Sequence, residues 1–414
     1  MPRLLALLVL FVGVSWTSAA DWPQWLGPTR DGASPEKVAA WKGAPKVSWR
    51  QPIGEGNSSP IVAGGRIFLH SKVKDRDDEE VLVLDAKDGK EVWRKTYPRG
   101  TGKFLYGNGP RATPAVADGK LYTYGITGLL TCWDAADGKQ LWQVDALKKF
   151  AAKNLLFGAS CSPLVEDKAV LLNVGAKGAS VVAFDKDKGE VAWKSQDDGA
   201  SYSSPIALGK GKERQVVFLT ADGVISLSPA DGTLFWRFPL KDKLFESSTT
   251  PARAGDVLLA SAITYGSAGL RLATKDGKPA MSEAWTNPKL TSYFATPVAV
   301  GNEHVYLVTG TTPNLFKPTP PQADLHCVEA ATGKTLWTRP KVGQYHASLL
   351  RTGDDKLLML EDGGDLVLLD PNPKEYRELA RSRVCGATWA HPALADGRLY
   401  LRDDKEVICL QLGE

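Results

Sequence analysis

Aromatic and hydrogen-bonding side chains recur along this chain just before a repeated landmark, in which a small or hydroxylated residue precedes proline. Aromatic faces offer a ligand contact area at low entropic cost, and a few polar groups can orient it. If the fold brings these side chains together, they could bind a planar or sugar-like ligand. The candidates are Tyr106, Asn108, Arg111, Tyr202, Glu246, Tyr293, Tyr345, His346, Trp389 and His391.

Cysteine and histidine are spaced too widely to predict a metal site. The five cysteines, at positions 132, 161, 327, 385 and 409, contain no Cys-x-x-Cys motif and no adjacent pair. The five histidines contain no pair at i and i+4, the usual zinc spacing on a helix. Glu246 is the only carboxylate among the candidates, whereas calcium chemistry needs several oxygen ligands and a general base. We predict no metal site, no catalytic residue and buried structural cysteines, although one disulfide is compatible with their number.

The segments that carry the candidates are repeated. Seven of the 13 tryptophans lie at positions 49, 93, 142, 193, 236, 285 and 337, a period of about 48 residues. Five of them end a common motif in which a glycine precedes the tryptophan by four residues. The five motifs are Leu84 to Trp93, Trp133 to Trp142, Phe184 to Trp193, Leu227 to Trp236 and Val328 to Trp337. In a degenerate copy ending at Trp285, the gap is eight residues.

Each repeat has the pattern of four short antiparallel strands. A short apolar strand follows the landmark, and a tight turn such as Ala63-Gly64-Gly65 leads to a second strand. A third strand ends at a turn of the Asp-Gly type, and the tryptophan lies in the fourth. Helical periodicity is absent. Four strands in about 45 residues, repeated around the chain, predict an all-β propeller, with a linear solenoid as the alternative.

The two ends of the chain predict how the ring closes. Ser348 to about Arg383 forms a seventh repeat that has lost its tryptophan. The C-terminus then supplies only three strands, whereas Lys46 to Pro52 resembles a fourth strand with Trp49 in place. Pairing the two completes eight four-stranded blades and hides two strand edges that would otherwise invite aggregation. The three C-terminal strands are expected at His391 to Leu394, Arg398 to Leu401 and Val407 to Leu412.

These repeats resemble the pyrroloquinoline quinone (PQQ)-type propeller repeat, with its A-x-D-x-x-T-G-K-x-x-W signature. The best match is Glu329 to Lys334, running on to Trp337. The stretch Asp21 to Trp25 is also similar to the DWPQW-type opening of a subgroup of secreted PQQ-like propeller proteins. The resemblance implies that each repeat tryptophan docks its blade against the next repeat. The docking residues would be Trp49, Trp93, Trp142, Trp193, Trp236, Trp285 and Trp337.

Proteins with this repeat fall into two functional classes, so the fold alone does not select one. PQQ-dependent alcohol and sugar dehydrogenases hold quinone and calcium at the propeller axis, and the alcohol dehydrogenases typically carry an adjacent cysteine pair, which is absent here. Binding propellers such as BamB are typically lipoproteins, and this chain has no lipidation cysteine. We predict a non-catalytic scaffold that binds a protein or a small ligand, without a cofactor. A PQQ- and calcium-dependent oxidoreductase and a carbohydrate-binding propeller are the alternatives.

Strand order predicts where such a ligand would bind. In a propeller blade, the loop before the first strand and the loop between the second and third strands lie on one face. The ten candidates should therefore line the mouth of the central channel. The Pro-rich insertion Thr311 to Ala323 should lie on the same face, as a lengthened loop or a docking element.

Composition and the N-terminus limit location and partners. The chain has 414 residues, a formal charge of +4 and no basic cluster, which argues against nucleic acid as a partner. Residues 1–20 have the pattern of a secretory signal peptide, with Arg3, an apolar run from Leu4 to Val14 and small residues before Asp21. We expect residues 21–45 to form an N-terminal extension and residues 46–414 a single propeller domain. The mature protein should be a soluble, exported monomer of a bacterial periplasm or cell surface.

Overall fold

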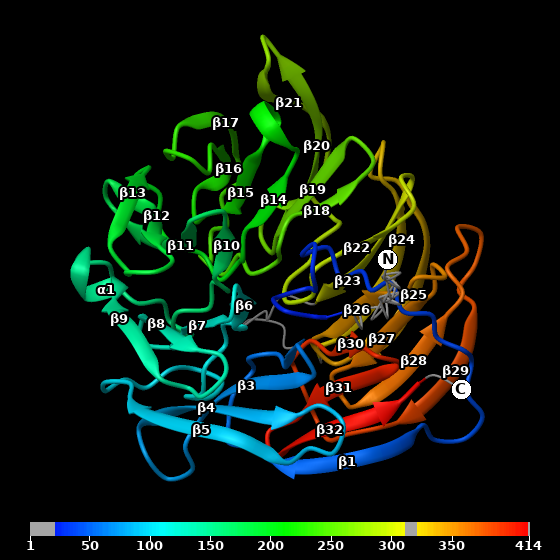
Figure 1. Cartoon of the computed structure of the whole chain (residues 1–414). Helices are drawn as coiled ribbons and strands as arrows, with labels where there is room; N and C mark the ends of the chain where they lie inside the picture. The colour runs from blue at the N-terminus through cyan, green and yellow to red at the C-terminus, as the bar shows by residue number, and fades with distance from the viewer. Residues whose placement is uncertain (1–20, 311–320, 413–414) are drawn as a thin grey trace, which may run out of the picture.

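The computed structural model describes residues 21–310 and 321–412. The predicted signal peptide and residues 311–320 of the Pro-rich insertion lie outside the described residues. Eight four-stranded antiparallel sheets are arranged in a ring around a central axis, as Figure 1 shows. The predicted all-β, eight-bladed propeller is therefore confirmed. The first strand of each blade lies next to the axis and the fourth strand lies at the rim.

The blades follow the chain in order. Blade 1 contains β2 (Ile61–Ala63), β3 (Arg66–Lys72), β4 (Asp78–Asp85) and β5 (Glu91–Pro98). Blade 2 contains β6 (Ala115–Ala117), β7 (Lys120–Tyr124), β8 (Leu129–Asp134) and β9 (Gln140–Asp145). Blade 3 contains β10 (Leu164–Glu166), β11 (Ala169–Ala176), β12 (Ala179–Asp185) and β13 (Val191–Ser195). Blade 4 contains β14 (Ile206–Leu208), β15 (Gln215–Leu219), β16 (Gly223–Leu227) and β17 (Leu234–Pro239).

The remaining blades follow the same plan. Blade 5 contains β18 (Ala252–Ala254), β19 (Val257–Ala262), β20 (Gly266–Lys275) and β21 (Lys278–Asn287). Blade 6 contains β22 (Val298–Val300), β23 (His304–Gly310), β24 (Ala323–Glu329) and β25 (Thr335–Gly343). Blade 7 contains β26 (Ala347–Arg351), β27 (Leu357–Glu361), β28 (Asp365–Leu369) and β29 (Glu378–Arg383). Two short helices, α1 (Ala146–Lys149) and the 3-10 helix η1 (Gly211–Glu213), lie in connections.

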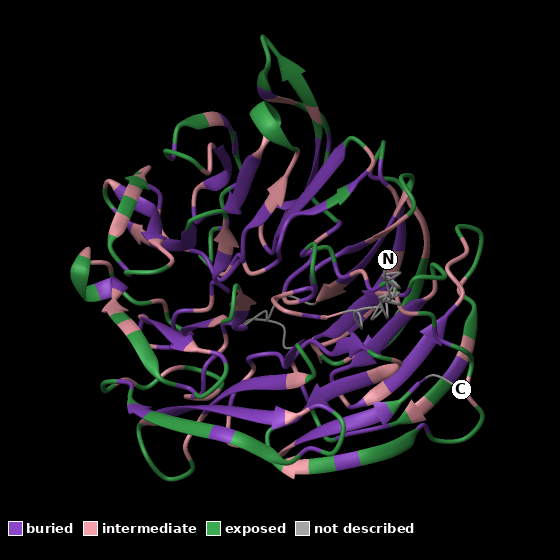
Figure 2. Cartoon of the chain, viewed as in Figure 1, coloured by how far each residue is buried: buried purple, intermediate pink, exposed green. Residues whose placement is uncertain are grey.

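Blade 8 is built from both ends of the chain, as predicted. It contains β30 (Ala393–Ala395), β31 (Arg398–Arg402), β32 (Glu406–Gln411) and the N-terminal β1 (Lys46–Pro52). β1 pairs antiparallel with β32, with Trp49 opposite Cys409 and a bulge between Val47 and Trp49. Figure 2 shows that the second and third strands of the blades are largely buried and the rim strands are largely exposed, so the hydrophobic core lies between neighbouring blades. The five cysteines are buried and unpaired.

Five of the seven repeat tryptophans dock on the turn of the next blade through one recurring geometry. The indole Nε1 of Trp93 donates to Ala135 O at 3.2 Å, and its ring covers Gly138. Gly138 has a φ of 72°, and a Cβ there would lie 2.6 Å from Trp93 Cε3. Glycine is thus required twice, for the left-handed turn and for the approach of the indole. The same stacking joins Trp49 to Gly89, Trp142 to Gly189, Trp193 to Gly232 and Trp285 to Gly333.

Two predicted docking residues depart from this geometry. Trp236 donates to Gln215 Oε1 within its own blade at 3.0 Å, although its ring packs in the core between blades 4 and 5. The reason lies in blade 5, where β20 and β21 form a long hairpin and nothing lies within 4 Å of a Cβ built at its turn glycine, Gly277. Trp337 donates to Asn372 O in a loop of blade 7 that lacks the turn glycine.

The Ser/Thr-Pro landmark also has a structural role, because its hydroxyl groups link neighbouring blades. Thr113 N donates to Ser162 Oγ at 3.0 Å, and Ser162 N donates to Ser204 Oγ at 2.9 Å. Ser59, Thr250 and His391 donate in the same way to the next landmark hydroxyl. This chain of bonds lies around the axis and holds the inner ends of the blades together.

We expect Gly138→Ala to destabilise the fold by about 2 to 4 kcal/mol, because it adds a methyl group against Trp93 to the cost of a left-handed alanine. Gly119→Ala in the same blade is the matched control, since its φ is 73° but nothing lies within 4 Å of its Cβ. That control should lose only about 1 to 2 kcal/mol. Urea unfolding measures both values, and equal losses would contradict the docking role of Trp93.

Candidate functional site

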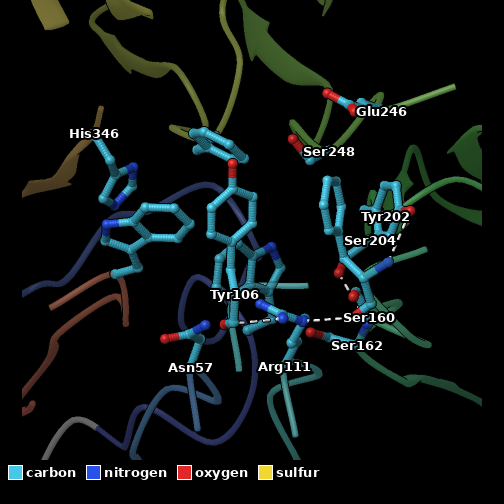
Figure 3. Close-up of a pocket in the computed structure, with 14 residues that line it drawn as sticks. Asn57, Tyr106, Arg111, Ser160, Ser162, Tyr202, Ser204, Glu246, Ser248 and His346 are labelled. Carbon is cyan, nitrogen blue, oxygen red and sulfur yellow. Dashed lines mark hydrogen bonds between the residues drawn. The ribbon is translucent and has the colours of Figure 1, made fainter. Parts of the chain in front are cut away.

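A cavity of about 130 Å³ opens at the axis, on the face that carries the loops before the first strands. It contains six of the ten predicted candidates: Tyr106, Arg111, Tyr202, Glu246, His346 and Trp389. Figure 3 shows these side chains converging from several blades. The other lining residues are Trp25, Asn57, Phe157, Ser160, Ser162, Ser204, Ser248 and Phe294.

The other four candidates lie behind the lining. Asn108 accepts from Phe104 N, and its own N donates to Glu55 Oε1 at 2.6 Å. The Tyr293 hydroxyl donates to Glu246 Oε2, and Tyr345 lies 5.8 Å from Trp389 between ring centroids. His391 is buried, with Nε2 2.8 Å from Leu349 O. These four residues support the wall and do not line it.

Aromatic rings form a nearly continuous belt around the mouth. Ring centroids are 5.1 Å apart for Tyr202 and Phe157, 5.6 Å for Phe157 and Tyr106, and 5.8 Å for Tyr106 and Trp389. Trp389 continues to Phe294 at 5.0 Å, and Phe294 stacks on Tyr293 at 3.8 Å. The bond from Tyr293 to Glu246 adds the carboxylate to the end of the belt. Tyr106 is 63% exposed and therefore faces solvent at the entrance.

Arg111 acts on the loop geometry. Its Nε donates to Phe157 O at 2.6 Å, and one terminal nitrogen donates to the carbonyls of Leu105, Tyr106 and Gly107. Burial lowers the pKa of Arg111 below its ordinary value. The guanidinium therefore joins the loops of two blades and positions Tyr106.

Two carboxylates near the mouth, Asp362 and Asp242, hold backbone N–H groups, whereas Glu246 lines the cavity. Asp362 accepts N–H bonds from Gln344, Tyr345 and His346, and Asp242 accepts from Glu246 N at 2.7 Å. Within residues 21–310 and 321–412, no group of three or more His, Cys, Asp or Glu side chains could hold a metal. Calcium takes six to eight oxygen ligands. The donor set at the axis, with Glu246 as its one lining carboxylate, does not fit the quinone and calcium pair of the dehydrogenase alternative.

His346 has an unusual state in the cavity wall. The residue is only 6% exposed, and neither of its ring nitrogens has a hydrogen-bond partner among the described residues. Burial lowers the pKa of His346 to about 4, against a smaller opposing effect of Asp362. The imidazole is therefore neutral at pH 7, with one unused donor and one unused acceptor. Leaving such groups unpaired is costly, which points to a bound partner.

The N-terminal extension forms part of the cavity, which the sequence did not reveal. Residues 21–38, here called the axial segment, cross the centre of the ring (dark blue in Figure 1). Trp25 lines the cavity and donates to Thr250 Oγ1 at 2.9 Å. The period of the repeats carries no information about this path. The DWPQW stretch could have indicated that the extension packs against the propeller, because two large apolar side chains in an extension are expected to be buried.

Arg30 fixes the axial segment below the mouth. Its side chain donates to Pro205 O at 2.7 Å, Pro163 O at 2.9 Å and Ser162 O at 3.1 Å, which are landmark carbonyls of blades 3 and 4. The residue is 3% exposed, and burial lowers its pKa to about 10. It remains charged at neutral pH, and the three carbonyls stabilise that charge.

The sequence model of one protein family, described as outer membrane protein assembly factor BamB, matches residues 32–105, 77–339 and 321–411. The chain belongs to this BamB family. BamB of Shewanella oneidensis is 23% identical over 316 residues, which cover 72% of this chain and 73% of that protein. The family resemblance predicted from the repeats is confirmed.

Solved structures share the fold of this BamB family member. BamB from Moraxella catarrhalis superposes with a TM-score of 0.61 at 16% identity, covering 89% of this chain and 98% of that one. Quinohemoprotein alcohol dehydrogenase from Comamonas testosteroni gives a TM-score of 0.68 at 15% identity, covering 95% and 81%. Both likenesses extend to the fold alone. In the part of the chain that the structure describes, no helix is long and apolar enough to cross a membrane.

We expect the His346 imidazole to titrate near pH 4, well below the ordinary value of 6.5. Because the folded pKa is the lower one, unfolding takes up a proton between those two pH values, and acidification through this window destabilises the fold by up to about 3 kcal/mol. NMR of the histidine Cε1–H signals measures the midpoint, with His346→Phe assigning the resonance. A midpoint near 6.5 would show that the ring is solvated.

We expect Arg30→Met to release the axial segment, because three buried carbonyls lose their donor at a cost of about 1 kcal/mol or more each. Limited proteolysis should then cleave within residues 21–45, and the melting midpoint should fall. Arg253→Met is the matched control, since Arg253 is exposed nearby and donates to Gly255 O in its own blade. Equal protease resistance of the two variants would refute the anchoring role.

Proposed function

We propose that this BamB family member is an exported, monomeric and non-catalytic binding propeller, which captures a protein or ligand at the mouth of its axial cavity. The observation that carries the proposal is an exposed apolar rim around an aromatic cavity. The rim residues are Leu105, Tyr106, Leu156, Leu244 and Phe245, exposed by 52%, 63%, 60%, 46% and 56%.

The rim is a contiguous feature at least between blades 1 and 3. Leu105 N donates to Leu156 O at 3.4 Å, which brings the two leucine-bearing loops together. Leu244 and Phe245 lie on the loop that Asp242 holds through its bonds to Leu244 N and Glu246 N. Exposed apolar groups gathered on one face are typical of an interaction site. Loops held at fixed positions also lose little entropy on binding.

The similarity to proteins named as outer membrane assembly factors supports a role in protein binding. The sequence of residues 1–20 supports export. The quinone-dependent alternative has weaker support. The cysteines are buried and separate, and the carboxylates of Asp362 and Asp242 near the mouth are bonded to backbone N–H groups.

Site-specific photocrosslinking tests the proposal in the protein's own host. Benzoylphenylalanine at position 156 should give a discrete crosslinked species, whereas the same group at position 141, on the exposed rim strand β9, should not. Leu141 is a matched control because it is a leucine exposed by 40%. Adding Phe245→Arg should reduce the crosslink at position 156 about tenfold, since a charge would be buried in the interface.

Two outcomes would contradict this function. One is the absence of any crosslink from positions 105, 156 and 244, which would contradict a protein partner at the rim. The other is a saturable, calcium-dependent rise of the melting midpoint with PQQ, because a ligand at 100 times its Kd stabilises the folded state by about 2.7 kcal/mol. That rise would favour the oxidoreductase.

A further inference from the structure

We propose that the axial cavity binds one uncharged sugar ring, an inference that rests on the proposed binding function and names its ligand class. The size of the cavity is suitable. Its volume is about 130 Å³, and an engineered protein cavity of about 150 Å³ holds one benzene ring. The six-membered ring of a pyranose is similar in diameter to benzene, and its hydroxyl groups, which make the sugar about twice as large, would extend toward the open mouth.

The aromatic belt supplies the first half of the recognition. Tyr106, Phe157 and Trp389 meet at tilted angles of 41° and 49°, so their faces enclose a hollow instead of stacking on one another. Aromatic faces carry a partial negative charge. The C–H groups on the face of a sugar ring are weakly positive and apolar, so a pyranose can pack flat against such a wall. Tyr106 stands at the entrance and would cover the bound ring (Figure 3).

The polar groups supply the second half. His346 offers one donor and one acceptor that no described residue uses. Glu246 has one carboxylate oxygen bonded to Tyr293, and its second oxygen is without a hydrogen bond among the described residues. The side-chain amide of Asn57 is likewise unpaired in that part of the chain, and it lines the same cavity. Hydroxyl groups both donate and accept, so adjacent sugar hydroxyls can pair with this mixed set.

The charges favour a neutral ligand over an ionic one. Arg111 and Glu246 place one positive and one negative side chain on the same cavity. A quaternary ammonium would be attracted to the aromatic faces and Glu246 but repelled by Arg111. An anion would find Arg111 already donating to four carbonyls. A sugar avoids both conflicts.

Calorimetry with the purified mature protein tests the inference. The probes are the methyl glycosides of glucose, galactose, mannose, xylose and N-acetylglucosamine, with choline and benzoate as cationic and anionic comparisons. At least one glycoside should bind with a Kd of the order of 1 mM, as expected for a ligand of this size. Choline and benzoate should not bind up to roughly 50 mM.

Variants locate the binding. Tyr106→Ala removes an exposed side chain, and His346→Phe keeps a ring but removes both nitrogens. Each should weaken glycoside binding by about tenfold. Leu141→Ala on the outer strand of blade 2 should leave the Kd unchanged. Circular dichroism and the melting midpoint verify that each variant is folded, and Tyr106→Ala decides the result if His346→Phe is unfolded.

The inference is overturned if none of the five glycosides binds, if choline or benzoate binds more tightly, or if the glycoside Kd is the same in Tyr106→Ala. Crosslinking at position 156 without glycoside binding would reject the sugar as the ligand but retain the proposed binding function. If neither crosslinking nor glycoside binding is observed, the proposed binding function is rejected as well. Glycoside binding without crosslinks would retain a carbohydrate-binding propeller.

Discussion

The contact between an indole ring and the glycine of the next blade sets the geometry of the whole molecule. Five glycines have a positive φ and lie where a Cβ would fall between 2.4 and 2.7 Å from the preceding blade's tryptophan. The separation of the outer strands is therefore fixed. At the inner ends, bonds from landmark N–H groups to landmark hydroxyls fix the second separation. At the five of the ring's eight blade junctions where both contacts occur, the angle between neighbouring blades is fixed.

The same ring determines the chemistry at its axis. Loops from different blades meet there, and buried carboxylates such as Asp242 and Asp362 hold them through backbone N–H groups. Acidic groups used in this way stabilise loop positions. The lining that remains is aromatic and mixed in polarity. Because dehydrogenases are built on the same fold, any difference in chemistry lies in these axial residues.

The fold was predictable because its information is repeated. A motif that recurs five times allows the degenerate copies and the missing tryptophan of blade 7 to be identified, and the unpaired strand count at the two ends predicts β1 in blade 8. Six candidates were found at the cavity because loop positions follow from strand order. Asn108, Tyr293, Tyr345 and His391 were misplaced by one layer, since strand order gives the face of a loop but not the direction of each side chain. Trp25 was missed because the axial segment lies outside the repeat, and the path of an unrepeated segment depends on tertiary contacts alone.

The pairing of β1 with β32 in blade 8 has a consequence for the order of folding. Arg50 of β1 and Glu406 of β32 are bonded to each other although they are 356 residues apart. Closing so long a loop is slow compared with forming local hairpins. Because the chain is synthesised from its N-terminus, β1 and the axial segment emerge first and remain without a partner strand. Blades 1 to 7 can form as local units during this time. The cavity needs both Trp25 and the last blade. It is therefore completed only after β32 has paired with β1.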